Sequence, residues 1–224
     1  MKRISAAICC ALGLALAVPA GSSATLTEVG VIPTATTTAP PTAPSCPASP
    51  CLAVSRTTGF QVKVTTTHNP LSSPRSGTIV AWTIVLGKPS AAQVSFFNAN
   101  EGGPSEAGLA VLRAEAKPNL TYKLIAQSPM VKLEPYFGKS AQFPLESTIP
   151  VKKGDIVALT VPTWAPALAL GFGKDTSWRA SRAKSQCTST STQTTQTTIG
   201  ASTQYYCLYQ TARLTYSATL VSTP

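Results

Sequence analysis

The stretch from Pro150 to Leu168, PVKKGDIVALTVPTWAPAL, decides the fold class of this chain. It begins with polar residues and continues with an apolar run. This order is compatible with two interpretations, a phosphate-binding loop or a turn that enters a buried strand. Phosphate loops carry several glycines and lead into a helix, whereas here the single Gly154 leads into the apolar run Ile156 to Val161. Glycine also suits the positive φ of a tight turn. The stretch therefore predicts a turn followed by a core strand.

Similar short apolar or alternating segments follow one another from Leu52 to Val221, separated by Gly, Pro, Asn and Asp. The segment Thr78 to Leu86, TIVAWTIVL, is apolar on both faces and predicts a central strand. Its expected inner-face residues are Val80, Trp82, Ile84 and Leu86. The closing segment ARLTYSATL alternates cleanly and predicts a half-buried strand. Its expected inner-face residues are Leu214, Tyr216, Ala218 and Leu220.

The whole pattern indicates an all-β protein. Further strands are expected at Phe60–Thr65, Leu109–Ala114, Tyr122–Gln127 and Gln142–Val151. No stretch has a convincing helical period, and the nearest rival, EAGLAVLRAEA, alternates in a way that favours a strand. Eight or more strands with regular turn signals predict a two-sheet antiparallel β-sandwich. We expect residues 52–224 to form this single domain.

The N-terminal segment predicts export. Residues 1–24 combine two basic residues, an apolar run and small residues, the order found in a secretory signal peptide. Cleavage is expected after Ala20 or Ala24, and the alternative is that the segment is retained as an anchor. Residues 25–51 are rich in Thr, Ala and Pro, which indicates an extended, disordered leader or a stalk. After cleavage, no apolar run is long enough to span a membrane.

Composition limits the classes of partner. The formal net charge is +10, but charged residues make up only 12% of the chain, about half the usual share. The basic residues are scattered, whereas nucleic-acid binders carry a dense basic stripe. We therefore expect no nucleic-acid partner. Glycans or anionic polymers of a cell envelope remain candidate partners.

Four cysteines follow the signal segment, an even number that predicts disulfides in an oxidising compartment. Local pairing is the simplest of three connectivities. It joins Cys46 to Cys51 and Cys187 to Cys207. A metal site is not expected, because the cysteine spacings do not suit zinc and His68 is the only histidine.

Catalytic chemistry has little support. His68 lies in the segment THNPLSSP between strands, and no nucleophile-elbow motif is present. Paired carboxylates such as Glu134 and Glu146 are not singled out by spacing. We therefore expect neither an enzyme nor a cofactor.

Aromatic residues offer the main functional hypothesis. Trp164 in PTWAP and Trp178 in DTSWRASR have loop-like contexts, and Tyr136 and Tyr205 lie in comparable positions. Exposed aromatic rings on β-sandwiches bind sugar rings by stacking. The alternative is that these rings close the ends of the sandwich. The Ser- and Thr-rich segment between Cys187 and Cys207 is either a presented binding loop or a hairpin extension.

The segments GTIVAWTIVLG, YKLIAQSP, FPLESTIPVKKGDIVALTVP and RLTYSATL together resemble a domain type that is frequent in exported proteins of actinobacteria. The resemblance covers roughly Val54 to Leu220. It implies a jelly-roll-like sandwich, and it implies no catalytic residue because that family has no established activity. The expected protein is thus a secreted or cell-surface, non-catalytic β-sandwich of structural or binding type, with a carbohydrate-binding module as the alternative.

Overall fold

The structure is a computed structural model of the chain and describes residues 24–31, 43–47, 51–188 and 194–222. The predicted signal peptide lies outside the described residues except for Ala24. The same holds for much of the expected leader and for residues 189–193 in the segment between Cys187 and Cys207.

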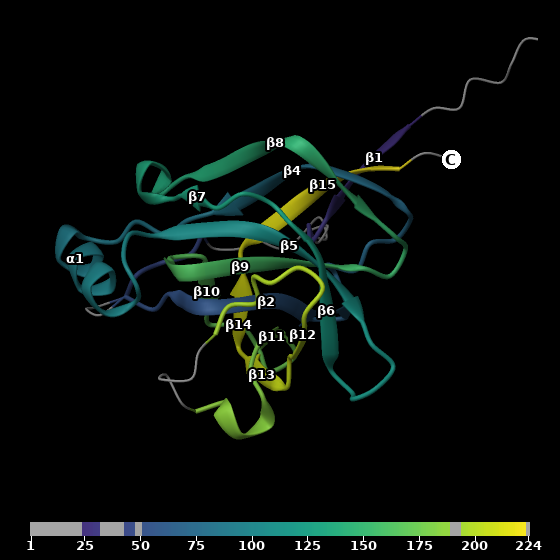
Figure 1. Ribbon diagram of the computed structural model, residues 1–224. Coiled ribbons are helices and arrows are strands. Elements are labelled where there is room, and N and C mark those ends of the chain that lie inside the picture. Colours follow the sequence, from purple (N-terminus) through teal and green to yellow (C-terminus); the bar gives the residue numbers. More distant parts are fainter. Residues whose placement is uncertain (1–23, 32–42, 48–50, 189–193, 223–224) are drawn as a thin grey trace, which may run out of the picture.

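Two antiparallel sheets and a small ribbon make up the fold (Figure 1). The smaller sheet has the order β1-β15-β4-β8. Its strands are β1 (Thr25–Val29), β4 (Gly77–Val85), β8 (Ser140–Val151) and β15 (Tyr216–Ser222). The ribbon joins β10 (Leu168–Leu170) to β14 (Ala212–Leu214).

The larger sheet has the order β12-β6-β5-β9-β2-β11-β13, with β3 added on β2 and β7 on β5. Its strands are β2 (Val54–Val64), β3 (Thr67–His68), β5 (Glu106–Ala114), β6 (Thr121–Gln127), β7 (Val131–Lys132), β9 (Ile156–Ala165), β11 (Ser177–Ala180), β12 (Ser202–Gln204) and β13 (Cys207–Gln210). Each predicted strand segment is present, but the closing segment, expected as one strand, is divided at Thr215 into β14 of the ribbon and β15 of the smaller sheet. The all-β, antiparallel sandwich-like fold is confirmed.

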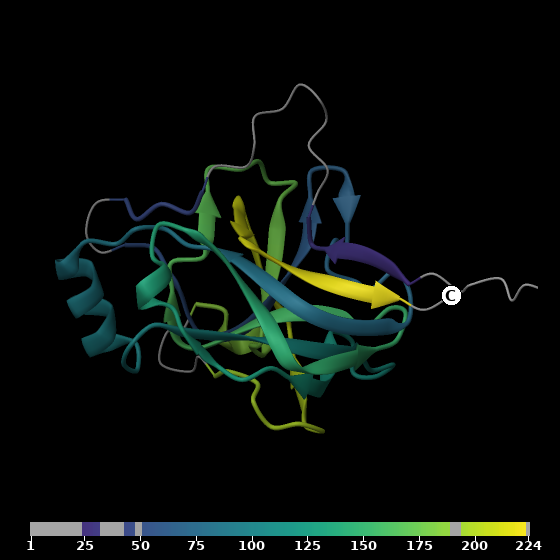
Figure 2. The same ribbon diagram turned by 90° about the horizontal axis from the view of Figure 1, so that it is seen from above.

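One apolar core joins the two sheets. The smaller sheet contributes Ile79, Trp82, Ile84, Ala218 and Leu220, and the larger contributes Leu109, Val111, Val157, Leu159 and Val161. Seen from above, β15 and β4 cross over the strands of the larger sheet (Figure 2). Residues Ile156 to Val161 are buried on both faces of β9, so the stretch that decided the fold class forms a central strand.

A β-bulge in β4 changes the expected inner face of that strand. Val80 was expected to point inward, but Ile79 is fully buried and Val80 is only half-buried. The register of β4 against β8 shifts between Ile79 and Ala81. One extra residue at a bulge reverses the side-chain alternation on one side of it. The expected alternation therefore holds for Trp82, Ile84 and Leu86 but not for Val80.

The sandwich begins earlier than expected. The first five residues of the predicted leader form β1, which pairs antiparallel with β15 along its whole length. Val29 is buried in the core, and the Glu28 carboxylate accepts hydrogen bonds from the hydroxyls of Ser217 and Thr219. The expectation of a disordered leader is thus corrected for Thr25–Val29, because this segment supplies both a core side chain and a sheet edge.

A helix that was not expected projects at one end of the sandwich (Figure 1). It is α1 (Ala91–Asn100), and Ser90 caps it, with reciprocal bonds between Ser90 and Gln93. Two short 3-10 helices complete the fold, η1 (Glu134–Tyr136) and η2 (Lys184–Gln186). No helix among the described residues is long and apolar enough to cross a membrane.

Candidate functional site

Trp164 is a structural residue, and the expectation that it lies exposed in a loop is wrong. It belongs to β9 and has 0% of its surface exposed. Its ring stacks on Phe97 of α1 at 4.9 Å between centroids, and its Nε1 donates to Asn98 Oδ1 (2.8 Å) and to the Gly103 carbonyl (3.1 Å). Trp164 therefore holds α1 against the sheet.

Tyr205 is also internal. Its ring is fully buried and packs against Phe60 and Tyr122 at 5.4 and 5.3 Å between centroids. The hydroxyl donates to Gln196 Oε1 at 2.5 Å. Burial raises the pKa of Tyr205 well above its ordinary value. A ring enclosed in this way has no face left for a ligand, which corrects the expectation for Tyr205.

Tyr136 lies at the end of η1 and is half-buried. Its ring makes an edge-to-face contact with Phe143 of β8, with 5.1 Å between the ring centroids. It closes the edge of the smaller sheet, in agreement with the alternative interpretation of these aromatic residues. Tyr136 does not line the pocket that Trp178 lines.

Trp178 lines a pocket. It lies in β11 rather than in a loop and is 7% exposed. One edge of the indole lies against Gly59 of β2, where a Cβ atom would approach two ring carbons to 3.0 Å. The other neighbour is Tyr209 of β13, whose ring centroid lies 4.8 Å from that of Trp178. The indole is therefore a fixed wall of the pocket rather than an open stacking surface.

The pocket lies at the end of the larger sheet where β11 pairs with both β2 and β13. Its volume is about 220 Å³. The walls come from three stretches of chain that are far apart in sequence. Val54 and Thr57 come from β2, and Trp178 and Arg182 come from β11 and the turn after it. Cys187 follows η2, and Tyr209 lies in β13, which the disulfide joins to Cys187. The antiparallel pairing of β11 with β13 sets Trp178 opposite Tyr209.

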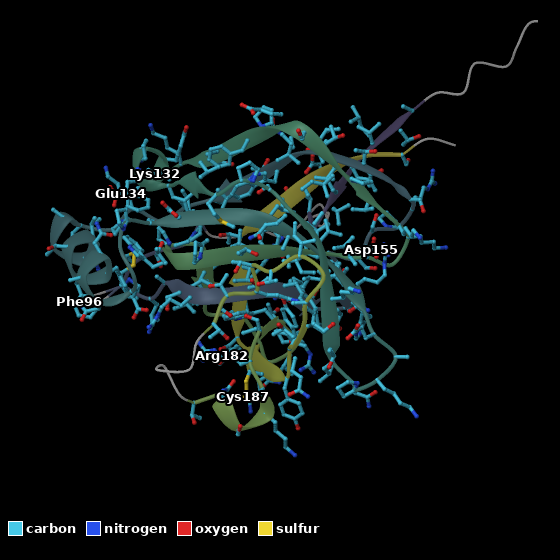
Figure 3. All side chains as sticks on the ribbon, in the orientation of Figure 1. Phe96, Lys132, Glu134, Asp155, Arg182 and Cys187 are labelled. Atoms are coloured by element: carbon cyan, nitrogen blue, oxygen red, sulfur yellow. A yellow bond between two sulfur atoms is a disulfide. The ribbon has the colours of Figure 1, made fainter. Side chains whose placement is uncertain are left out.

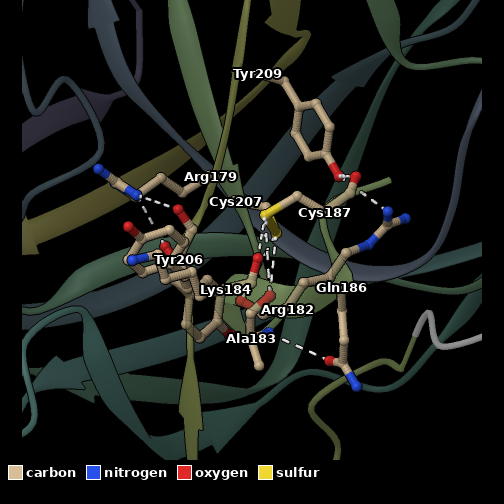
Figure 4. Close-up of a disulfide and its surroundings, with 10 residues drawn as sticks. Arg179, Arg182, Ala183, Lys184, Gln186, Cys187, Tyr206, Cys207 and Tyr209 are labelled. Carbon is tan, nitrogen blue, oxygen red and sulfur yellow. Dashed lines mark hydrogen bonds between the residues drawn. A yellow bond between two sulfur atoms is a disulfide. The ribbon is translucent and has the colours of Figure 1, made fainter. Parts of the chain in front are cut away.

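Arg182 gives this pocket its charge. The residue is 8% exposed, and its Nη1 donates to the Tyr209 hydroxyl at 2.9 Å. That hydroxyl in turn donates to the Cys187 carbonyl at 3.0 Å, as Figure 4 shows. Burial lowers the pKa of Arg182 from its ordinary value, the interaction with Tyr209 partly opposes this, and the nearby positive charge of Arg56 lowers it further. The guanidinium is thus a desolvated cation that one neutral hydroxyl holds in place.

The disulfide between Cys187 and Cys207 fixes the remaining wall (Figure 4). It joins the end of η2 to the first residue of β13, two residues before Tyr209. The second disulfide joins Cys46 to Cys51, and Cys51 packs with Phe97 and Trp164. Both bonds confirm the local pairing that the sequence predicted.

The turn at residues 152–155 is structural, as predicted. Gly154 has a φ of +89°, and Asp155 is 2% exposed. The Asp155 carboxylate accepts two bonds from Arg113 and one from the backbone N–H of Lys152, each at 2.8 Å. Burial alone would raise the pKa of Asp155, but these bonds and the neighbouring positive charges lower it below its ordinary value.

Folding also gathers scattered basic residues around a second concavity of about 820 Å³. Arg75, Arg113 and Lys152 line it. Lys123 lies opposite Arg113 across the β5–β6 pair, and the backbone of Lys153 bonds to Ser76 of the same rim. Asp155 offsets the charge of Arg113. We call this concavity, with its five basic residues, the basic groove. Sequence spacing did not reveal it, because its members lie on four separate segments.

Metal and catalytic groups were not expected at these sites. Among the described residues, no cluster of three or more His, Cys, Asp or Glu side chains could hold a metal ion. His68 lies in β3 with its side chain exposed, where it pairs with Lys63 of β2. At the Trp178 pocket the polar side chains of Arg182 and Tyr209 can form hydrogen bonds, and Arg182 adds a positive charge.

Comparison with known proteins gives no match: no protein-family model, no curated protein and no solved structure is similar to this chain. The resemblance to exported actinobacterial domains therefore stays a prediction, while the β-rich fold it implies is present.

Proposed function

We propose that this chain is an exported, non-catalytic binding protein and that its ligand occupies the pocket beside Trp178. The observation that carries the proposal is the meeting of Trp178, Tyr209 and the buried Arg182 around one concavity. Binding sites are typically concave and apolar, with a few polar groups that orient the ligand. The two disulfides suit a protein that works in an oxidising compartment, which supports export.

The size of the pocket favours a small ligand. Sites for drug-sized molecules measure roughly 300–1,000 Å³, so a pocket of about 220 Å³ suits a single sugar residue or a molecule of that size. Tyr209 is half-buried and offers an aromatic surface next to the donor Arg182. This combination supports the carbohydrate-binding alternative, with Tyr209 in the role first expected of Trp164.

The lining residues favour binding over turnover. General acid–base catalysis needs a group whose pKa lies near the operating pH. The ionisable groups around the pocket are Arg182 and Tyr209, because Cys187 is held in a disulfide. No histidine, carboxylate or lysine is among the described residues that line the pocket, and these side chains commonly carry general acid–base catalysis.

Calorimetric titration with a panel of monosaccharides tests the proposal, with tryptophan fluorescence as a second signal. We expect at least one sugar to bind and to change the fluorescence. Thr188 is exposed at the pocket, so Thr188→Trp should block the site without disturbing the fold. Trp164→Phe is the matched control, because Trp164 lies in the α1 contact and outside the pocket. Absence of both heat and fluorescence change with every sugar would refute the proposal.

The basic groove supports a second candidate function, attachment to an anionic polymer. Three basic residues line one concavity, and the backbones of Lys123 and Lys153 pair with or bond to residues that line it. Asp155 offsets only the charge of Arg113. Grooves lined by one sign of charge concentrate counter-ions of the opposite sign. We infer that the groove can hold the protein on a negatively charged cell surface while the pocket binds its own ligand.

A further inference from the structure

Two hydrogen-bond donors on residues that line the Trp178 pocket lack partners within the part of the chain that the structure describes. Trp178 Nε1 and Arg182 Nε are both buried, and neither has an acceptor among the described residues. Both side chains line the same pocket. Buried polar groups in folded proteins are almost always hydrogen-bonded, and each exception asks for an explanation. Two such donors at one pocket point to acceptors that arrive with a ligand.

Arg182 also has no ion-pair partner among the residues that the structure describes. The ion pairs among the described residues join Arg56 to Glu101 and Arg113 to Asp155. Arg182 takes part in neither. The nearby charge of Arg56 is also positive and therefore disfavours the charged form of Arg182. Buried charges in proteins are normally paired with an opposite charge. The pocket therefore has a positive potential, and a neutral sugar carries no negative charge to pair with it.

We propose that the pocket selects a ligand that carries a carboxylate, an acidic monosaccharide in particular, and that this carboxylate pairs with Arg182. This inference rests on the proposed binding function and names its ligand class. A carboxylate has two acceptor oxygens and no donor, so it matches the two unpartnered N–H groups without placing a further donor beside them.

The orientation of Arg182 fits this ligand. Nη1 donates to the Tyr209 hydroxyl. The other side of the guanidinium, formed by Nε and Nη2, takes no part in that bond. That side presents two parallel N–H donors, the geometry that binds both oxygens of a carboxylate at once. Nε is covered in this structure. The guanidinium therefore turns toward the pocket when the ligand binds, while the bond from Tyr209 to the Cys187 carbonyl keeps the wall in place.

Matched pairs of sugars test the inference by calorimetric titration of the full chain. The pairs are glucose with glucuronate, galactose with galacturonate, and N-acetylglucosamine with N-acetylmuramate, and glucose 6-phosphate serves as a separate anionic probe. In at least one pair the acidic sugar should bind about tenfold more tightly, since a charge-assisted, two-pronged bond is stronger than a neutral one. Glucose 6-phosphate should gain less, because its phosphate lies further from the ring.

Arg182→Gln should reduce the preference for the acidic sugar to within about twofold, because affinity for the acidic sugar should fall more than affinity for its neutral partner. Arg75→Gln is the control, because it removes the same charge from the exposed rim of the basic groove. If Arg182→Gln fails to fold, Arg182→Lys keeps the charge but not the two-pronged donor and should retain only part of the preference.

The outcomes separate the inference from the proposed function. Equal affinity within every pair overturns the carboxylate assignment and leaves a sugar-binding pocket. A preference for the acid that survives in Arg182→Gln places the carboxylate elsewhere and also overturns it. A stronger response to glucose 6-phosphate than to any uronate replaces the carboxylate with a phosphate. No binding by any sugar removes the proposed function itself.

Discussion

Arg113 and Asp155 form a two-pronged ion pair that fastens β5 to the turn before β9. Arg113 Nε donates to Oδ1 and Nη2 to Oδ2, each at 2.8 Å. Asp155 is buried, whereas the Arg113 side chain is 40% exposed (Figure 3 labels Asp155). The same carboxylate accepts the backbone N–H of Lys152, so it sets both the shape of the turn and the position of the neighbouring strand.

Replacing this carboxylate should destabilise the domain. Asp155→Asn keeps the shape but removes the negative charge that strengthens all three bonds, and we expect the free energy of unfolding to fall by about 1.5–3 kcal/mol. Urea denaturation followed by circular dichroism measures the change. Asp175→Asn removes an exposed carboxylate and should stay within about 0.5 kcal/mol of the wild type. Equal losses in the two variants would contradict a special role for Asp155.

The same ion pair predicts a pH dependence. The hydrogen bonds and charges of Arg113 and Lys152 outweigh burial and lower the pKa of Asp155 below its ordinary value of 3.8. The unfolded chain therefore binds this proton more readily than the folded one. The stabilisation is complete above about pH 5 and is lost as the pH falls through the lowered pKa.

Thermal unfolding of the wild type and Asp155→Asn at a series of pH values checks this sign. The midpoints should differ clearly near pH 6 and converge as the pH falls through the lowered pKa of the wild-type carboxyl. A difference that stays constant over this range would mean that the charge of Asp155 does not contribute.

Local sequence patterns predicted the strands well because each strand buries its own apolar residues. They failed where a distant contact decides the outcome. Trp164 follows Pro162, which suggested a loop, yet Pro162 falls in β9 where the pairing with β2 is irregular between Ser55 and Thr57. A proline is tolerated at such a place because little hydrogen bonding is lost there. The helix α1 has a weak apolar face, but its capping residues Ser90 and Gln93 did offer a signal.

The candidate site was only partly predictable. Trp178 was identified by its type, and the pairing of Cys187 with Cys207 by proximity in sequence. Arg182 was missed because a single arginine in a polar segment carries no signal of burial. Its importance depends on the antiparallel pairing of β11 with β13, which brings Tyr209 and the disulfide to it. No local pattern encodes that pairing.

Removing the Cys187–Cys207 bond should affect both stability and binding. The double variant Cys187→Ser/Cys207→Ser opens a loop of 20 residues and should lose about 3 kcal/mol of unfolding free energy. It should also weaken the pocket ligand, since the Cys187 carbonyl accepts the bond that orients Tyr209. Denaturant titration and calorimetric binding measure the two effects.

The other disulfide supplies the control. Cys46→Ser/Cys51→Ser opens a loop of only 5 residues and should lose about 2 kcal/mol at most. Ligand affinity should not change, because Cys51 packs in the separate cluster around Trp164. If both double variants weakened binding equally, the effect would come from lost stability and not from the wall of the pocket.

The basic groove predicts salt-sensitive binding of polyanions. A linear polyphosphate should bind the wild type at low ionic strength and dissociate as salt is added, because exposed charges are screened over about 10 Å at 0.1 M salt. Arg75→Gln/Lys152→Gln removes two charges that line the groove and should weaken this binding about tenfold. Lys88→Gln/Lys174→Gln removes the same net charge from exposed positions elsewhere and should have a much smaller effect. Equal weakening by both double variants would show that the polymer responds to the overall positive charge of the protein and that the groove is not its site.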